Sequence, residues 1–221
     1  MDLTTATIGV IGGTGPQGRG LAYRWARAGL RVVLGSRDAA RASAAAADLC
    51  AQAGVDTVTG ADNLGCASAS DIVLVAVPWD GHAATIEPLR SALAGKIVID
   101  CVNPLGFDKQ GPYALPVEEG SAAQQAARLL PDSTVTAAFH HVSAVLLADP
   151  ELDKVDTDVL VLGEDREAVG VVIELANAVA GVRGIYGGRL RNAGQIEALT
   201  ANLIAINKRY SAHAGLRITD V

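Results

Sequence analysis

The stretch that decides the fold is Thr7–Gly18, with the sequence TIGVIGGTGPQG. A short β-branched run is followed by a glycine-rich turn, and residues 16–28 then carry apolar side chains at helical spacing. Residues 13–18 fit the pattern G-x-G-x-x-G between that strand and that helix. In this pattern the first glycine permits a tight turn, the second lets a pyrophosphate approach the backbone, and the third lets helix and strand pack closely. The stretch predicts a dinucleotide-binding turn rather than a glycine-rich turn without a ligand.

Outward from this stretch, strand and helix patterns alternate along the chain. Strands are expected at Thr7–Ile11, Arg31–Leu34, Val55–Thr59, Asp71–Val77, Gly95–Cys101, Thr134–Phe139, Asp158–Leu162 and Val182–Tyr186. Helices are expected at Pro16–Ala28, Asp38–Ala53, His82–Ala94, Ser121–Leu130, Glu167–Ala180 and Arg191–Ala212. Apolar strands joined by helical crossovers indicate a parallel sheet covered on both faces. Residues 102–120 show no period and are expected to form a long functional loop.

The end of the second strand distinguishes between the two nicotinamide cofactors. A site specific for NAD places Asp or Glu there, but this chain has Ser36 and Arg37, with Arg41 one helical turn later. A hydroxyl and two guanidinium groups suit a ribose 2′-phosphate, which a carboxylate would repel. The alternative is that both arginines are solvated residues at a helix start, a poor place for cations without an anion. The sequence therefore favours NADP.

Length and composition limit the number of domains and the classes of partner. A chain of 221 residues is long for one domain and short for two. We expect an α/β protein: a Rossmann-type doubly wound parallel sheet in an NADP-binding domain, residues 1–142, and a smaller C-terminal α/β domain, residues 143–221. The net charge of −6 argues against nucleic acid as a partner. No apolar stretch is long enough for a membrane span and the N-terminal residues lack a signal pattern, so a cytoplasmic location is expected.

Several chemistries are missing from the sequence. The three cysteines, Cys50, Cys66 and Cys101, have neither metal-site spacing nor a neighbouring histidine, and they are expected to be buried thiols in a reducing compartment. No Tyr-x-x-x-Lys pair of short-chain dehydrogenases is present. A nucleotide site without an evident acid–base group fits a redox partner that is itself a cofactor. Two alternatives stay open, namely an NADP-dependent reductase of a small carbonyl or imine and a non-catalytic NADP-sensing protein.

The chain resembles the F420-dependent NADP reductases over nearly its whole length. The residues that carry the resemblance are Ile11–Gly15 with Gly35–Arg37, Val77–Trp79, Phe139–His141, Gly188–Asn192 and Glu197–Thr200. The resemblance implies an oxidoreductase that transfers hydride between NADP(H) and the deazaflavin coenzyme F420, without a catalytic side chain or a metal. It also implies a Rossmann domain and a small C-terminal domain that together form the deazaflavin cavity, and a homodimer.

The resemblance further implies roles for individual residues. The cofactor-binding residues expected on this basis are Gly13, Thr14, Gly15, Pro16 and Gln17 at the pyrophosphate, Ser36, Arg37 and Arg41 at the 2′-phosphate, Val77 and Pro78 beneath the nicotinamide, His140 at the deazaflavin, and Ala144 and Ala214 in the cofactor lining. In the long loop, Asn103–Gly106 departs from the stretch rich in proline and valine that some archaeal members have.

Further candidates stand at strand ends or near the last helix. Trp79 packs either on the nicotinamide or in the core, and His141 is a weaker ligand candidate than His140. His82 is expected to be structural. Arginines near the start of the last helix are expected either to hold the acidic tail of coenzyme F420 or to be solvated. This last group consists of Arg183, Arg189 and Arg191, with Asn192 beside them.

Overall fold

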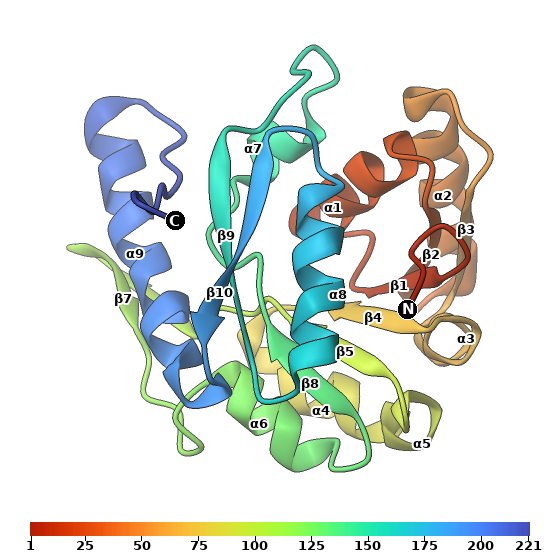
Figure 1. Ribbon diagram of the computed structural model, residues 1–221, viewed down its shortest axis with the longest axis horizontal. Helices are drawn as coiled ribbons and strands as arrows, with labels where there is room; N and C mark the ends of the chain where they lie inside the picture. The colour runs from red at the N-terminus through yellow and green to blue at the C-terminus, as the bar shows by residue number, and fades with distance from the viewer.

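The computed structural model describes residues 1–221 and contains one eight-stranded sheet in the order β10-β9-β8-β5-β4-β1-β2-β3 (Figure 1). Its strands are β1 (Thr7–Ile11), β2 (Arg31–Ser36), β3 (Val58–Asp62), β4 (Ile72–Val75), β5 (Ile97–Asp100), β8 (Thr134–Ala137), β9 (Thr157–Gly163) and β10 (Val182–Gly188). The first six pair in parallel, β9 is antiparallel to β8, and β10 is parallel to β9. The predicted doubly wound α/β fold is confirmed.

Helices cover both faces of the sheet. One face carries α1 (Pro16–Arg27), α2 (Ala39–Ala53), α7 (Ala144–Ala148) and α8 (Arg166–Asn177), which share one hydrophobic core. The other face carries α3 (Asn63–Ala69), α4 (His82–Ile86), α5 (Arg90–Leu93), α6 (Ala122–Leu129) and α9 (Ala193–Tyr210), which contribute to a second core. No helix of the chain is long and apolar enough to cross a membrane.

Three elements differ from the sequence-based expectation. The third strand begins three residues later than expected, and α3, which was not predicted, follows it directly. The helix expected at His82–Ala94 is divided into the 3-10 turn η1 (Trp79–Gly81), α4, the 3-10 turn η2 (Glu87–Leu89) and α5. Pro88 lies at the break, because proline lacks the amide hydrogen that a continuous helix needs.

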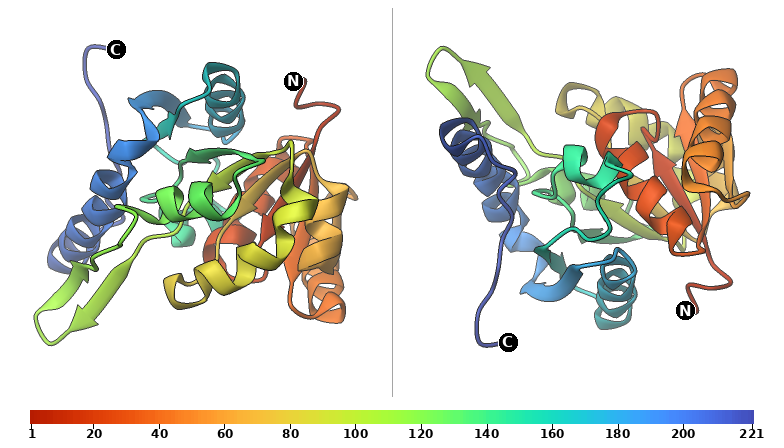
Figure 2. Two further views of the ribbon diagram at one scale, coloured as in Figure 1. Left: turned by 90° about the horizontal axis from the view of Figure 1, so that it is seen from below. Right: turned by 90° about the horizontal axis from the view of Figure 1, so that it is seen from above.

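Residues 102–120 were expected to form a long loop, but part of this segment has regular structure. They contain a two-stranded antiparallel hairpin of β6 (Leu105–Asp108) and β7 (Gly111–Ala114), which projects from the sheet and packs beside α9 (Figure 2). The turn is organised by Asp108, whose carboxylate accepts hydrogen bonds from the amides of Gln110 and Gly111. Gly111 has a positive φ of 120°. The pairing escaped detection because each strand has only four residues, which is too short for a clear period.

The C-terminal residues continue the sheet of the N-terminal ones. After the predicted boundary at residue 143, β9 joins the edge of β8 with reversed direction, so the two parts share a sheet and a core. Trp25 of α1 donates its indole N–H to the carbonyl of Leu175 in α8 and packs edge-on against Phe139, with ring centroids 5.6 Å apart. At the predicted boundary the strand direction changes, whereas the sheet and the core continue across it.

The strand order places a topological switch between β1 and β4. From β1 the chain crosses over α1 on one face, while α4 and α5 after β4 lie on the other. Loops at the carboxyl ends of the two strands diverge and leave a crevice, which is where open α/β sheets bind ligands. The candidate site lies at this edge of the sheet.

Candidate functional site

The glycine turn after β1 has the geometry expected of a G-x-G-x-x-G turn, except that another glycine makes the tight turn. Gly12, rather than Gly13, has the left-handed backbone, with φ of 80°, and a Cβ atom there would meet the carbonyl oxygen of Ala76 at 2.4 Å. Gly15 caps α1, with Pro16 in its first position. A Cβ on Gly18 would lie 2.9 Å from Cγ1 of Val10, which confirms the close packing of helix on strand. The free amides at the start of α1 therefore face the crevice.

A hollow of about 450 Å³ opens along the crevice. It is lined by Gly12, Thr14, Gly15, Ser36, Arg37, Asp38, Arg41, Asn63, Ala76, Val77, Pro78, Gly81 and Thr85. Arg37 and Arg41 are exposed at its β2 end and neither forms an ion pair within the chain. The carboxylate of Asp38 between them is engaged in capping α2, where it accepts the amides of Ala40 and Arg41. Two cations without an anion indicate an anion site.

A second hollow of about 300 Å³ continues from the first. The two share Gly15, Ala76, Val77 and Pro78, and the second adds Pro16, Gln17, Cys101, Val102, Asn103 and His140. Gln17 was expected at the pyrophosphate, but its amide nitrogen donates to the carbonyl of Phe139 at 3.1 Å. Of the predicted residues of the glycine turn, Gly13 lines neither hollow. The others lie with those at the ends of β2 and β4 and with His140 along one continuous crevice.

The histidine turn after β8 is strained and firmly held. Phe139 is buried with φ of 65°, a conformation that costs energy for a residue with a side chain. The carbonyl of the next residue, His140, accepts hydrogen bonds from Asn103 at 2.7 Å and Thr200 at 3.2 Å. These bonds reach the turn from the loop after β5 and from α9, so two distant segments fix where the backbone of His140 lies.

The ring of His140 is neutral and has unused hydrogen-bonding capacity. Its side chain lines the second hollow, and neither ring nitrogen has a partner within the chain. Burial lowers the pKa of His140 to about 4, outweighing the opposing influence of Asp100. A buried imidazole normally has a partner, so this one is suited to hydrogen-bond a polar group held in the hollow.

The structure separates other candidates from this crevice. Trp79 does not line either hollow, and its ring is stacked on His82, with centroids 5.6 Å apart. Ala144 begins α7 and Ala214 lies beside His141, both outside the two hollows. His141 is bound to the backbone carbonyl of Asp158. The Sγ atoms of Cys66 and Cys101 lie against backbone carbonyls, and no group that could hold a metal is present.

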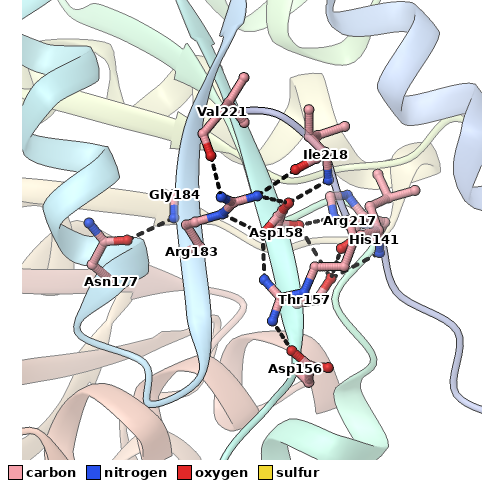
Figure 3. A network of polar contacts seen from close by, with 11 residues as sticks. His141, Asp156, Thr157, Asp158, Asn177, Arg183, Gly184, Arg217, Ile218 and Val221 are labelled. Atoms are coloured by element: carbon pink, nitrogen blue, oxygen red, sulfur yellow. Dashed lines mark hydrogen bonds and ion pairs between the residues drawn. The ribbon is translucent and has the colours of Figure 1, made fainter.

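The predicted arginine cluster is wrong for Arg183. Figure 3 shows its guanidinium clamped on the buried carboxylate of Asp158, at 3.0 and 2.8 Å, together with Arg217 from the C-terminal segment. Arg183 lies at the start of β10 and Arg189 just after its end, so the intervening strand separates them. Arg189 pairs with Glu164 at the surface, at 3.1 Å. Spacing along the chain could not show that Arg183 pairs with Asp158 on the neighbouring strand β9.

The structure also adds residues that sequence reasoning missed. Asn63 and Thr85 line the first hollow, and the side-chain oxygen of Asn63 is buried without a partner. Glu197 of α9 accepts hydrogen bonds from the amides of Ala122 and Ala123 at the start of α6. Asn63 directly follows β3, and a polar residue at a strand end was a usable signal once that strand was placed correctly.

The crevice fits a phosphorylated dinucleotide with a second, separate ring system beside it. Free amides at the start of α1 and the cations beyond β2 suit phosphates at one end. At the other end His140, whose buried ring nitrogens have no partner within the chain, lines a space together with Val77, Pro78 and Val102, which suits flat rings that carry polar edges.

Comparisons with known proteins agree with this geometry. Residues 7–104 match the family model described as NADP oxidoreductase coenzyme F420-dependent. The chain is 42% identical to the F420-dependent NADP reductase of Methanothermobacter thermautotrophicus, over 97% of this chain and 95% of that one. The corresponding protein of Methanocaldococcus jannaschii is 38% identical, over 97% and 98%.

A solved structure from Arthrobacter sp. FB24, assigned to the same reductases, superposes with a TM-score of 0.80. It is 28% identical, and the match covers 97% of this chain and 99% of that one. Because the curated relatives match over nearly their full lengths, this chain belongs to the family of F420-dependent NADP reductases.

Proposed function

We propose that this chain is an NADPH:coenzyme F420 oxidoreductase whose crevice holds the two coenzymes end to end. The observation that carries the proposal is the continuity of the two hollows, one ending at the unpaired Arg37 and Arg41 and the other at the unpartnered His140. A protein that only senses NADP needs the first hollow alone. The second hollow is the reason to expect a second ring system.

In this proposal, residues of the first hollow bind NADP(H). Thr14, Gly15 and the start of α1 take the pyrophosphate, and Ser36, Arg37 and Arg41 take the 2′-phosphate. Val77 and Pro78, which line both hollows, lie along the nicotinamide. Asn63 offers its unpartnered oxygen within the same hollow.

Residues of the second hollow and the C-terminal part complete the deazaflavin side. His140 donates or accepts a hydrogen bond at the ring while remaining uncharged near neutral pH. Arg189, which precedes the 3-10 turn η3 (Leu190–Asn192), and Asn192, which ends it, are proposed to contact the acidic tail. We further propose that residues 143–221 act as the smaller substrate-completing part, since α9 reaches the His140 turn through Thr200.

The chain's own contribution to the reaction is orientation and the exclusion of water. When bound, the two coenzymes supply the redox chemistry themselves, because a hydride passes directly between the nicotinamide and deazaflavin rings. Thr200, Asn103 and Gln17 fix the His140 turn, and the buried backbone of Val102 closes one wall of the second hollow. Holding both rings in a reactive geometry removes most of the entropic cost of a bimolecular step.

The deciding experiment follows the absorbance of the oxidised deazaflavin while NADPH is added to the protein. Loss of that absorbance with turnover supports the proposal. Tight NADPH binding without turnover of F420 or of any carbonyl or imine contradicts it and supports a sensor. Turnover of small carbonyls or imines, but not of F420, identifies an NADP-dependent reductase of another class.

We also propose a homodimer acting in the cytoplasm. Exposed apolar residues on the hairpin and on α9, Phe107, Tyr113, Ile206 and Tyr210, support an interface between two copies. Three unpaired cysteines support a reducing location. Light scattering after size-exclusion chromatography tests the assembly, and a monomeric mass would refute it.

A further inference from the structure

A chain of polar side chains runs from the protein surface to the base of the second hollow. His82 and Asp100 are both fully buried, and Nε2 of His82 lies 2.7 Å from Oδ2 of Asp100. On the other side of the ring, Nδ1 lies 2.9 Å from Oε1 of Gln125. The amide nitrogen of Gln125 donates to Glu119 at 3.3 Å, and Glu119 pairs with the exposed Arg128.

The order of these partners decides which protons His82 carries. Glu119 is an ionised carboxylate, since hydrogen bonds from Arg128 and Gln125 hold its pKa below the usual value despite partial burial. A carboxylate only accepts, so Gln125 must turn its NH₂ group toward Glu119 and its oxygen toward His82. That oxygen also only accepts, and so does the carboxylate of Asp100. Both ring nitrogens of His82 therefore face acceptors.

Other charges around His82 agree with a positive ring. Burial alone lowers the pKa of His82, but the hydrogen bond and the charge of Asp100, with smaller contributions from Gln125 and Glu197, raise it above its ordinary value. Burial also raises the pKa of Glu197 to about 7. One face of the ring is stacked on Trp79, with centroids 5.6 Å apart and an interplanar angle of 30°, an arrangement that favours a cation.

The His82–Asp100 pair joins the two loops that flank the nicotinamide end of the crevice. His82 begins α4, directly after the turn that contributes Pro78 and Gly81 to the lining. Asp100 ends β5, and its second oxygen accepts the amide of Val102 at 3.0 Å, which places Val102 in the wall of the second hollow. Nearer the sheet, Sγ of Cys101 also contacts the carbonyl of Val75 at 3.2 Å, but the His82–Asp100 pair is the link between two side chains.

We propose that His82 is a positioning residue that is kept doubly protonated by the order of its partners, with Glu119 setting that state from a distance by orienting Gln125. The positive ring holds Asp100, and through it the Val102 turn, against the Pro78–Gly81 turn. These two turns form opposite walls at the nicotinamide end of the crevice, and the pair fixes their relative positions. The link to nicotinamide placement rests on the proposed function, whereas the protonation state does not.

The first test examines the protein without coenzymes. Nitrogen-15 NMR of the histidine rings, with His82→Gln to assign the signal, is expected to show both nitrogens of His82 protonated at pH 7, unlike the neutral His140. In Glu119→Gln the residue beside Gln125 is an amide, so Gln125 can reverse and His82 should lose a proton at a lower pH than in the wild type. Arg128→Gln is the matched control, because it keeps the Glu119 carboxylate and should keep the signal.

A neutral pattern for His82 at pH 7 in the wild-type protein would overturn the inference. So would an equal effect of Glu119→Gln and Arg128→Gln on its titration. Either result leaves the proposed function standing, because that function depends on F420 reduction by the wild-type protein, measured separately.

The second test separates positioning from binding. In His82→Gln, kcat should fall about tenfold or more, because small displacements of a reacting ring are costly, while Kd for NADPH changes less than about threefold. The phosphate contacts that dominate binding lie elsewhere in the crevice. Equal loss of affinity and kcat, with unchanged folding by circular dichroism, would show that His82 does not position the ring.

Discussion

At the residue scale, the most informative observation is that Arg37 and Arg41 face the crevice without an anionic partner within the chain. The carboxylate of Asp38, which stands between them, is occupied in capping α2. We therefore propose that selectivity for a phosphorylated ribose comes from side chains beyond the end of β2 and is independent of the glycine turn that both nicotinamide cofactors use.

Replacing Arg37 by Ala is expected to weaken NADPH binding about 10- to 150-fold and NADH binding little, because only the 2′-phosphate loses a charged hydrogen bond of about 1.5–3 kcal/mol. Isothermal titration calorimetry with both cofactors measures the difference. Arg90→Ala, on the exposed pair with Asp132, is the matched control. Equal losses for NADPH and NADH would contradict the assignment.

His140 should make stability depend on pH in acid. Its pKa is lowered from 6.5 to about 4 by burial, so between these values the unfolded chain binds a proton that the folded chain does not. Stability is therefore lost as the pH falls from 6.5 to 4, by up to about 3 kcal/mol at 1.4 kcal/mol per pKa unit. Urea unfolding at pH 4.5 and pH 7 should show a smaller difference for His140→Leu than for the wild type; equal differences would refute this.

His140 also has an expected kinetic effect. His140→Ala should lower the rate of hydride transfer with little change in NADPH affinity, because the ring lines the second hollow and not the phosphate end of the first. Single-turnover absorbance at saturating NADPH makes the measurement. Unchanged turnover would return His140 to a purely structural role.

At the scale of elements, α7 depends on one residue of α1. Arg24 is 4% exposed and donates to the carbonyls of Leu146, Leu147, Asp149 and Leu152, at 2.6–2.9 Å. Two of these carbonyls belong to the last turn of α7, where no amide of the helix is available to donate to them. A five-residue helix gains little stability locally, so it is held by this guanidinium.

Arg24→Met should cost about 3 kcal/mol or more in the free energy of unfolding, because it leaves several buried carbonyls without donors. Urea unfolding measures the loss, and hydrogen exchange should show faster opening over residues 144–153 than elsewhere. Arg27→Met, one turn along on the exposed side of α1, should change stability by about 0.5 kcal/mol or less. Equal costs would refute the role of Arg24.

At the scale of the whole molecule, the C-terminal segment is fastened across the edge of the sheet by Asp158. Its carboxylate accepts hydrogen bonds from Arg183, Arg217 and the amide of Ile218 (Figure 3). The bonds from Arg183 and Ile218 hold the pKa of Asp158 below its usual value despite burial. The same residue accepts His141 at its backbone carbonyl. The end of the chain is thus connected to the turn that carries His140.

Asp158→Asn should release the C-terminal segment, because two half-exposed guanidinium groups lose the charge that holds them. Trypsin is expected to cut at Arg217 about tenfold faster than in the wild type, since cleavage follows the population of the opened segment. Mass spectrometry of the shortened chain gives the rate. Asp156→Asn, at the exposed partner of Arg217, should change it little, and identical rates in both variants would refute the role of Asp158.

The sequence by itself determined the doubly wound sheet, through strand and helix patterns that alternate along the chain. It also determined the glycine turn and placed two arginines just beyond the second strand, because these depend on local patterns within 41 residues of the start. Resemblance to known reductases then pointed to His140, whose environment no local pattern describes.

Only the tertiary structure decided the rest, because it depends on partners far apart in the chain. Pairing of His82 with Asp100 and Gln125, of Arg183 with Asp158, and of the His140 carbonyl with Asn103 and Thr200 requires the sheet and helices to be assembled first. The sequence marks such residues as polar. Burial then makes each of them find a partner, and the fold alone determines which one is within reach.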